Sequence, residues 1–316
     1  MDKEVKKRYR DFGSFLCETF PYKVQKISVH AGFSCPNRDG TKGWGGCTYC
    51  NNLTFSPAYC HTHQTVSEQL KAGIRFFARK YPEMKYIAYF QAYTNTYSSI
   101  DVLVRKYEEA LAFPEVTGLI VATRPDCMPE ELLDYFAQLS RQKFVLIEYG
   151  MESTLDATLR RINRGHTQAE SEDAIRRTAD KGIHTGAHLI LGLPGEERSD
   201  ILRHADVVSE LPLTTLKLHQ LQLIRHTQMA KDYAEHPEWF HLPGMEEYID
   251  LVISFLERLN PSAVVERFVS QSPKELLIAP DWGQKNHVVT AKVNQRMAER
   301  NTRQGKLYTA KYIANH

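Results

Sequence analysis

Short apolar runs alternate with amphipathic stretches along most of this chain. Between the runs, apolar residues recur at the spacing of one helix face, as at Leu70, Ile74 and Phe77. Strands that alternate with helices form βαβ units, and such units build a parallel sheet. The expected strands cover residues 24–30, 86–90, 118–122, 144–147, 188–191 and 216–221, with a late extra strand at 264–268.

Helix signals fill the segments between these strands. Pro129 suits a first helical turn, and the two acidic residues after it suit the positive end of the helix dipole. Gly182 is a typical residue at a helix C-terminus. The expected helices cover residues 66–80, 100–111, 155–162, 169–181 and 245–259, and one more begins near 129. The pattern predicts an α/β fold, a partial (β/α)6 TIM-like barrel with catalytic groups at the C-terminal ends of the strands.

The barrel is expected to span residues 23–269, between an N-terminal extension at 1–22 and a basic C-terminal extension at 270–316. No apolar run is long enough to cross a bilayer. The charged first residues lead into no signal-peptide core, so we expect a cytoplasmic protein that does not contact membranes. The net charge of +2 at pH 7 is too small to indicate a partner by itself.

Three of the six cysteines lie in a glycine-rich loop after the first expected strand. Cys35, Cys47 and Cys50 have the spacing C-x11-C-x2-C. Thiolates are soft ligands that suit iron–sulfur clusters or zinc. Three thiolates on a four-iron cluster leave one iron open to another ligand. The alternative is a structural zinc site with Cys60 as its fourth ligand.

This loop resembles the cluster loop of the radical S-adenosylmethionine (SAM) superfamily, and the likeness extends over roughly residues 23–268. The long first spacing is similar to that of the branch containing the Elongator catalytic subunit. A smaller bacterial group related to that subunit also carries the segment HAGFSCPNRDG, found here at residues 30–40. The resemblance implies a [4Fe-4S] cluster on the three cysteines and cleavage of SAM to methionine and a 5′-deoxyadenosyl radical. It also implies a reductant such as flavodoxin or ferredoxin.

The resemblance places further SAM contacts at the ends of later strands. Residues 91–95 occupy the position of a segment that touches the methionine amino group, although they depart from its Gly-Gly-Glu-like pattern. Near the ribose, Glu152 replaces the glutamine of related proteins. Each assignment has an alternative. Residues 91–95 could be ordinary polar loop residues, the carboxylates at the end of the fourth strand could form a solvated rim, and the arginines at the helix end could simply suit the helix dipole. The choice between Arg160 and Arg164 for the SAM carboxylate stays open. The implied SAM contacts are Gln91, Tyr93, Glu148, Glu152, Arg160, Arg164, Ile190 and Gly192.

Two polar residues near the end of the sixth strand are candidates for substrate contacts. Lys217 and His219 alternate along this strand, so both side chains are expected to point toward the barrel mouth. The alternative is a lysine paired within the fold and a histidine whose hydrogen bonds are satisfied there.

The C-terminal extension is basic: residues 285–311 contain seven Lys or Arg residues and only one acidic residue, Glu299. Val289, Val293 and Met297 form a helical stripe that could dock on the barrel, beside a basic stripe that could meet phosphate. A solvated face is the alternative. The basic stripe comprises Lys292, Arg296, Arg300 and Arg303, and a diluted second cluster comprises Lys3, Lys6, Lys7, Arg8 and Arg10.

The resemblance favours tRNA as the partner, since the Elongator catalytic subunit modifies wobble uridines. The chain is too short for an Elongator-type acetyltransferase domain and has no second cysteine cluster, which disfavours acetyl transfer and sulfur insertion. The expected reaction is radical removal or remodelling of a C5 substituent, such as carboxymethylaminomethyl to aminomethyl, with a methyltransferase acting downstream. The alternatives are a radical SAM enzyme on a small metabolite and a zinc-stabilised RNA-binding protein without catalysis.

Overall fold

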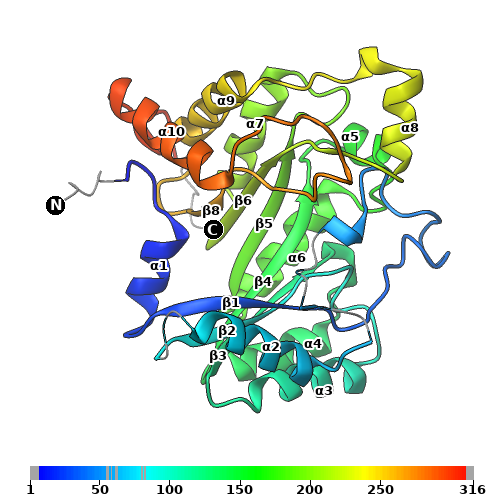
Figure 1. Cartoon of the computed structure of the whole chain (residues 1–316), viewed down its shortest axis with the longest axis vertical. Coiled ribbons are helices and arrows are strands. Elements are labelled where there is room, and N and C mark those ends of the chain that lie inside the picture. The colour runs from blue at the N-terminus through cyan, green and yellow to red at the C-terminus, as the bar shows by residue number, and fades with distance from the viewer. Residues whose placement is uncertain are drawn as a thin grey trace, which may run out of the picture.

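The computed structural model describes residues 7–310 except 55, 56, 58, 61, 62, 80 and 82. Its centre is a seven-stranded parallel sheet in the order β1-β2-β3-β4-β5-β6-β8, curled into a half barrel (Figure 1). The predicted α/β partial barrel is confirmed. The late extra strand is β8, which lies at the edge of the sheet beside β6. The strands are β1 Val24–Val29, β2 Lys85–Phe90, β3 Val116–Thr123, β4 Phe144–Glu152, β5 His184–Leu191, β6 Thr215–Gln220 and β8 Val264–Arg267.

Helices cover the outer face of this sheet, where their apolar stripes pack against buried strand residues (Figure 1). Thr65 and Thr167 begin two of them with capping boxes, in which the threonine hydroxyl and a glutamate three residues later satisfy free backbone N–H groups. The barrel helices are α2 Val66–Ala78, α3 Ile100–Leu111, α4 Glu130–Leu139, α5 Asp156–Arg161, α6 Gln168–Asp180, α7 Arg198–Ser209 and α9 Met245–Arg258. None of the described helices is both long and apolar enough to span a membrane.

Several elements differ from the expected pattern; strand β4, for example, continues past the predicted 147 to Glu152. Helix α7 was not predicted, because His204 lies in its buried face among Ile201, Ala205 and Val208. Helix α8 (Gln228–Glu235), also unpredicted, buries only Met229 among its residues. Strand β5 begins four residues before the predicted 188, since its first half is polar or small and still buried. Short 3-10 helices complete this set: η1 Asn52–Thr54, η2 Pro125–Cys127 and η3 Pro237–Trp239.

Helix α1 (Phe12–Thr19) closes the bottom of the half barrel, at the N-terminal ends of the strands. Phe12 and Phe15 pack in an apolar cluster with Phe144 of β4 and Val264 of β8. Asp11 caps the helix by accepting hydrogen bonds from two backbone N–H groups. The lower barrel interior is therefore apolar and filled.

The two ends of the described chain meet beside β8. The Val265 amide donates to the Arg10 carbonyl at 2.7 Å, and the Arg10 amide donates to Gln304 Oε1 at 2.9 Å. Gln304 Nε2 in turn donates to the carbonyls of Asn260 and Ala263. Segments from opposite ends of the sequence thus stabilise the same edge of the sheet.

The C-terminal extension packs on the barrel through helix α10 (Asn286–Glu299). Val289, Val293 and Met297 are buried, which confirms the predicted docking stripe. A small antiparallel pair, β7 (Leu223–Ile224) with β9 (Leu277–Ala279), ties the preceding segment to the barrel.

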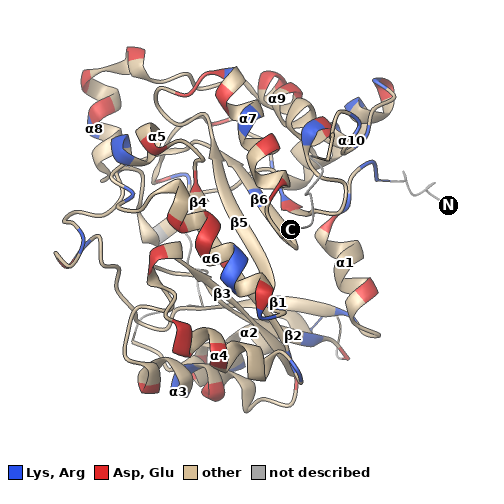
Figure 2. Ribbon diagram, turned by 180° about the vertical axis from the view of Figure 1, so that it is seen from behind, with Lys and Arg blue, Asp and Glu red and all other residues tan. Residues whose placement is uncertain are grey.

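Most of the basic stripe is paired with acidic residues rather than free. Lys292 and Arg296 form ion pairs with Glu246 of α9, and Arg296 and Arg300 form ion pairs with Asp250, while Arg303 is exposed. Figure 2 shows the blue stripe of α10 beside acidic residues of α9. In the N-terminal cluster, Lys7 contacts Asp11 and Arg10 contacts Glu18, whereas Arg8 contacts Asn301; Lys3 and Lys6 lie outside the described residues.

Candidate cluster and cofactor site

The cysteine loop follows β1 and is held by hydrogen bonds to its own backbone and to the end of α5. The amides of Lys42 and Gly43 both donate to the Pro36 carbonyl. Asn37 is buried, and its Nδ2 donates to the Asn163 carbonyl. Asn163 Nδ2 returns a hydrogen bond to the Gly46 carbonyl at 2.9 Å. A Cβ atom on Gly43 would lie 2.4 Å from Asn37 Oδ1, so this turn requires glycine.

This loop brings the three predicted cluster ligands, Cys35, Cys47 and Cys50, to one cavity of about 160 Å³ at the C-terminal ends of the strands. N–H donors surround their sulfur atoms. Arg164 Nη1 lies 3.5 Å from Cys47 Sγ, and Asn52 Nδ2 lies 3.5 Å from Cys50 Sγ. Such N–H···S contacts stabilise thiolates that bind iron and tune the potential of a cluster.

Cys60 is not part of this cavity. Its buried Sγ donates to Gln69 Oε1 at 2.9 Å, and burial raises the pKa of the Cys60 thiol to about 11. A tetrahedral zinc ion with bonds of about 2.3 Å draws its sulfur ligands to about 4 Å from one another. Within the described ranges, no three His, Cys, Asp or Glu side chains are grouped to hold a single ion. The structure thus brings three cysteines to one cavity and leaves Cys60 outside it.

Two buried arginines flank the cysteines. Arg124 forms a two-pronged ion pair with Asp126, through Nε at 2.9 Å and Nη2 at 3.0 Å. Lys42 of the cysteine loop contacts the same carboxylate at 2.6 Å. Burial opposes ionisation of Asp126, but Arg124 and Lys42 lower its pKa to about 2. The loop is therefore fastened to the end of β3 by a carboxylate that stays charged.

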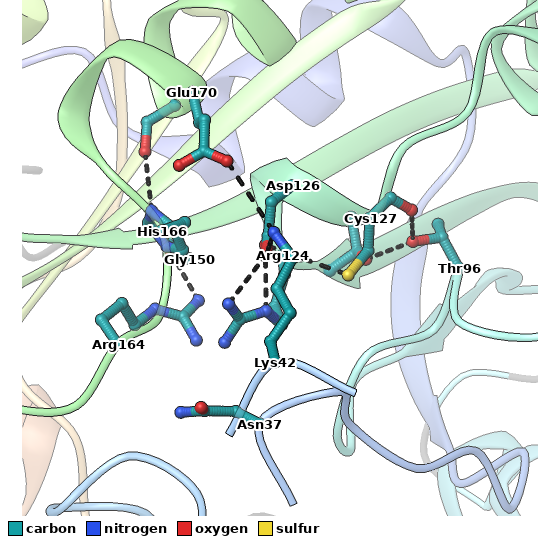
Figure 3. Close-up of polar contacts among 12 residues, drawn as sticks. Asn37, Lys42, Thr96, Arg124, Asp126, Cys127, Gly150, Arg164, His166 and Glu170 are labelled. Atoms are coloured by element: carbon teal, nitrogen blue, oxygen red, sulfur yellow. Dashed lines mark hydrogen bonds and ion pairs between the residues drawn. The ribbon is translucent and has the colours of Figure 1, made fainter. Parts of the chain in front are cut away.

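Figure 3 shows the guanidinium groups of Arg124 and Arg164 pointing toward one another. Arg164 Nη2 donates to the Gly150 carbonyl at 2.6 Å, and Glu152 lies 3.7 Å away. Nη1 of Arg124 and Nε of Arg164 are buried and have no hydrogen-bond partner in the described protein. Two facing cations with free donors require anions, and cluster thiolates and a SAM carboxylate meet that need.

Five of the eight predicted SAM contacts line this cavity: Gln91, Tyr93, Glu148, Glu152 and Arg164. The other three do not. Arg160 is exposed on α5, Ile190 is packed in an apolar cluster, and Gly192 forms a turn with φ of 90°. Between the two candidate arginines, the fold therefore brings only Arg164 to the cavity. The individual roles of all eight residues stay predictions.

The end of β4 is shaped to hold Arg164. Glu152 has φ of 69° in a bulge of the strand, so its side chain turns toward the cavity, where burial raises the pKa of its carboxyl group. A Cβ atom on Gly150 would lie 2.6 Å from Glu152 Oε1 and 2.7 Å from Arg164 Nη2. Glycine at this position thus leaves room for the guanidinium group.

Next to the cavity lies a layer of four charged side chains and one tyrosine, which we call the ionic layer. Its members are Lys26, Tyr89, Glu148, Lys217 and Glu266. Lys217 Nζ lies 2.5 Å from Glu148, 3.0 Å from Glu266 and 3.0 Å from the Tyr89 hydroxyl. Lys26 of β1 also pairs with Glu266 of β8, across the open side of the half barrel. Burial opposes ionisation of Glu266, but Lys217 and Lys26 lower its pKa to about 2.

The two predicted substrate contacts consequently occupy different places. Lys217 is engaged by two carboxylates in the ionic layer and does not line the cavity, whereas His219 does. His219 lies with its ring 5.6 Å from that of His188. Burial, assisted by Arg267, lowers the pKa of both imidazoles, so both are neutral at pH 7. Sequence reasoning assigned no site role to four further cavity residues. Arg38 lies in the cysteine loop, Asn52 just after it, His188 within β5 and Arg267 at the end of β8.

Comparison with known proteins identifies this arrangement. Residues 37–208 match the radical SAM superfamily, and residues 213–299 match the radical SAM C-terminal domain. The chain belongs to the radical SAM superfamily. A relative of this radical SAM protein is the uncharacterized protein YtqA of Bacillus subtilis, 34% identical over 304 residues that cover 96% of this chain and 94% of that protein.

Likeness to Elongator proteins is weaker and shorter in sequence. Elongator complex protein 3 of Schizosaccharomyces pombe is 26% identical over 179 residues, which cover 54% of this chain and 32% of that protein. The structure of archaeal Methanocaldococcus infernus Elp3 with an N-terminal deletion superposes with a TM-score of 0.66 at 15% identity. That match covers 90% of this chain but only 64% of the Elp3 chain, and it shows a shared fold.

As a member of this superfamily, the radical SAM protein uses a [4Fe-4S] cluster and SAM as cofactors. Cys35, Cys47 and Cys50 would hold the cluster, which when bound supplies the electron that cleaves SAM. Arg124 and Arg164 would offset the negative charge of the thiolates and of the SAM carboxylate. The apolar cluster at the barrel bottom excludes water from the interior on the side away from the cysteines.

Proposed function

We propose that this radical SAM enzyme removes or remodels a C5 substituent of the wobble uridine in tRNA, converting carboxymethylaminomethyl to aminomethyl. SAM is the two-electron oxidant and becomes methionine and 5′-deoxyadenosine. The N–CH2 bond of the carboxymethyl group is oxidised and then hydrolysed, which releases glyoxylate and leaves the amine. Flavodoxin or ferredoxin supplies the electron that primes the cluster, and a methyltransferase acts next on the exposed amine. All of these steps are placed in the cytoplasm.

The likeness to Elongator complex protein 3 supports a nucleic-acid substrate. It extends over 179 residues and so reaches well beyond a cysteine motif. The fold shared with archaeal Elp3 spans 90% of the chain, including the strands that line the cavity. The Elongator subunit modifies wobble uridines, so the resemblance supports the C5 side chain of this uridine as the group that reacts.

The observation that carries the proposal is the composition of the cavity. One wall holds the three cysteines and the arginines that face them, and the opposite wall, from β5, β6 and β8, holds two neutral histidines and a third arginine. A side chain that bears both an amine and a carboxylate can be oriented between such walls by hydrogen bonds and charge. An apolar substrate would leave these buried polar groups without partners.

One observation favours the second candidate, a radical SAM enzyme on a small metabolite. Glu246 and Asp250 pair with Lys292, Arg296 and Arg300 of the basic stripe, which lowers the positive charge that the stripe offers to an RNA backbone. The cavity of about 160 Å³ also suits a small group. A uridine side chain inserted from a tRNA and a free metabolite both satisfy this limit.

Nucleoside analysis of tRNA separates the two candidates. In a strain that lacks the gene, carboxymethylaminomethyluridine should accumulate while its aminomethyl and methylaminomethyl derivatives disappear. Complementation with the wild-type gene should restore them, and the Cys47→Ala variant, matched in expression, should not. An unchanged wobble-uridine profile refutes the tRNA proposal and favours the second candidate, a radical SAM enzyme that acts on a small metabolite.

A further inference from the structure

The cavity wall opposite the cysteines is built by the later part of the chain. The cysteines and the five cavity-lining SAM candidates lie within residues 37–208 or just before them, in the part that matches the superfamily core. Arg267 and His219 belong to residues 213–299, which match the C-terminal domain. His188 of β5 completes this wall beside them.

Arg267 differs from the two arginines beside the cysteines in its charge balance. Its Nη2 lies 3.2 Å from His188 Nε2, and its Nε is buried without a hydrogen-bond partner. Arg124 has Asp126 and Arg164 has Glu152, but no ion pair joins Arg267 to a carboxylate in the described part of the chain.

The carboxylates of the ionic layer do not fill this role. Glu148 is paired with Lys217, and Glu266 is paired with both Lys217 and Lys26. The layer is therefore neutral without Arg267. A guanidinium group that faces a cavity and has a free buried donor is a receptor for an anion, which it can bind with two parallel hydrogen bonds.

The neighbouring histidines position Arg267 without competing with it for an anion. His188 and His219 are neutral, so they add no charge. His188 Nε2 accepts from Arg267 Nη2 and orients the guanidinium group, while the one N–H of His219, at Nδ1, donates to the Gln220 carbonyl. The free donors on this wall are therefore those of Arg267.

A second cavity provides a way in. It has a volume of about 670 Å³ and lies at the open side of the half barrel, with Lys26, Phe76 and Phe77 in its lining. Tyr89 and Arg267 line both this cavity and the one at the cysteines. A group that enters between the edge strands β1 and β8 would therefore meet Arg267 first.

We propose that Arg267, oriented by His188, binds a carboxylate of the substrate on the wall opposite the cluster. Naming this anion as the carboxylate of the carboxymethylamino group rests on the proposed function. The assignment explains selectivity between substrate and product, because the aminomethyl product has lost the anion and releases the site.

Anticodon stem–loops that differ at one group test the proposal with reconstituted enzyme. The first carries carboxymethylaminomethyluridine, the second carries the amide of that group, and the third carries unmodified uridine. The wild type should bind the acid more tightly than the amide. Arg267→Gln should weaken binding of the acid by about 10- to 100-fold, the loss of one charge-assisted pair, and leave the amide unchanged. Arg203→Gln, on the exposed face of α7, is the matched control.

Two readouts exclude other roles. SAM affinity is measured for Arg267→Gln in parallel: a loss as large as the loss of acid binding would overturn the proposal by making Arg267 a cofactor residue, whereas a smaller loss supports it. Equal weakening of all three stem–loops would overturn the carboxylate in favour of a backbone phosphate. Arg267→Lys keeps the charge without the fork and should lie between wild type and Arg267→Gln, which guards against misfolding of one variant.

A small probe keeps this test separate from the tRNA proposal. N-methylglycine carries the same amine and carboxylate, and N-methylglycinamide lacks the anion. Wild-type enzyme should show saturation-transfer NMR contacts to N-methylglycine that are lost in Arg267→Gln. If the wild type binds no stem–loop but binds N-methylglycine through Arg267, the proposed function fails and the anion site stands. If the wild type and Arg267→Gln bind N-methylglycine equally, the anion site is refuted.

Discussion

Removal of the Lys217 amine tests the ionic layer directly. In Lys217→Met, the side chain keeps its length and apolar stem but no longer compensates Glu148 and Glu266. Lys26 still pairs with Glu266, so the uncompensated charge falls on Glu148. The change is conservative in volume, and its effect is therefore electrostatic.

The expected loss can be worked out from the charges. Lys26 and Lys217 balance Glu148 and Glu266, so the wild-type layer has no net charge and the variant has one excess negative charge. Removing one partner of a buried ion pair costs about 3–5 kcal/mol, and we expect about 4 kcal/mol of unfolding free energy to be lost at pH 8. Adding Glu148→Gln restores neutrality, so the double variant should recover about half of that loss.

The pH dependence of the unfolding free energy provides an independent test of the buried charge on Glu148. Burial already raises the pKa of Glu148, and removing Lys217 removes the main influence that lowers it. A carboxyl group whose folded pKa exceeds its unfolded value of about 4.3 destabilises the fold fully above the folded pKa and not at all below the unfolded one. The gap between wild type and Lys217→Met should therefore narrow as the pH falls from 8 toward about 5.

Urea unfolding followed by circular dichroism measures both effects on protein without its cluster, with Lys71→Met of α2 as a surface control. A loss below about 1 kcal/mol in Lys217→Met, the value of an exposed pair, would refute the assignment of a buried and fully charged layer. So would a gap that widens on acidification, or a double variant whose loss equals the sum of the single losses.

Three further predictions concern the site and the tail. Cys47→Ala should lose the visible absorption and iron of the reconstituted cluster while Cys60→Ala keeps both, and loss in both variants would show a fourth protein ligand. Gly150→Ala adds a methyl group 2.7 Å from Arg164 Nη2, so SAM affinity should fall about tenfold in equilibrium dialysis with the iron content unchanged. Arg296→Gln should cost about 0.5–1 kcal/mol in urea at low salt and leave tRNA affinity unchanged; weaker binding of tRNA would return this stripe to the RNA surface.

The fold was largely predictable because its signal is periodic and local. Strands such as β4 contain a short apolar run, and predicted helices such as α9 have an apolar face. Helix α7 escaped because His204 is buried by a contact with Thr154, far away in sequence. A polar residue that finds such a partner looks, in sequence, like an exposed one.

The site was predictable where chemistry and spacing coincide, as at the three cysteines, and less so where charges pair across the fold. Lys217 and Arg296 both looked like free cations, because nothing in the local sequence shows which carboxylates they meet. Arg267 was not predicted as a site residue for the opposite reason, because it looked like a paired cation and is not one among the described residues. Its neighbours in the chain gave no sign that Glu266 would be taken by Lys26 and Lys217, which leaves its guanidinium without a carboxylate partner in the described chain.

The contact between the two chain ends beside β8 has a consequence for synthesis. Helix α1 is made first, yet the strand residue Val264 that completes its apolar cluster, and the Val265 amide that pairs with Arg10, are made near the end. The lower interior of the half barrel therefore stays open to water, and to other chains, until β8 has left the ribosome. Cysteines that need an intact barrel to present their thiols should accordingly receive iron only after β8 has been made and has paired with Arg10.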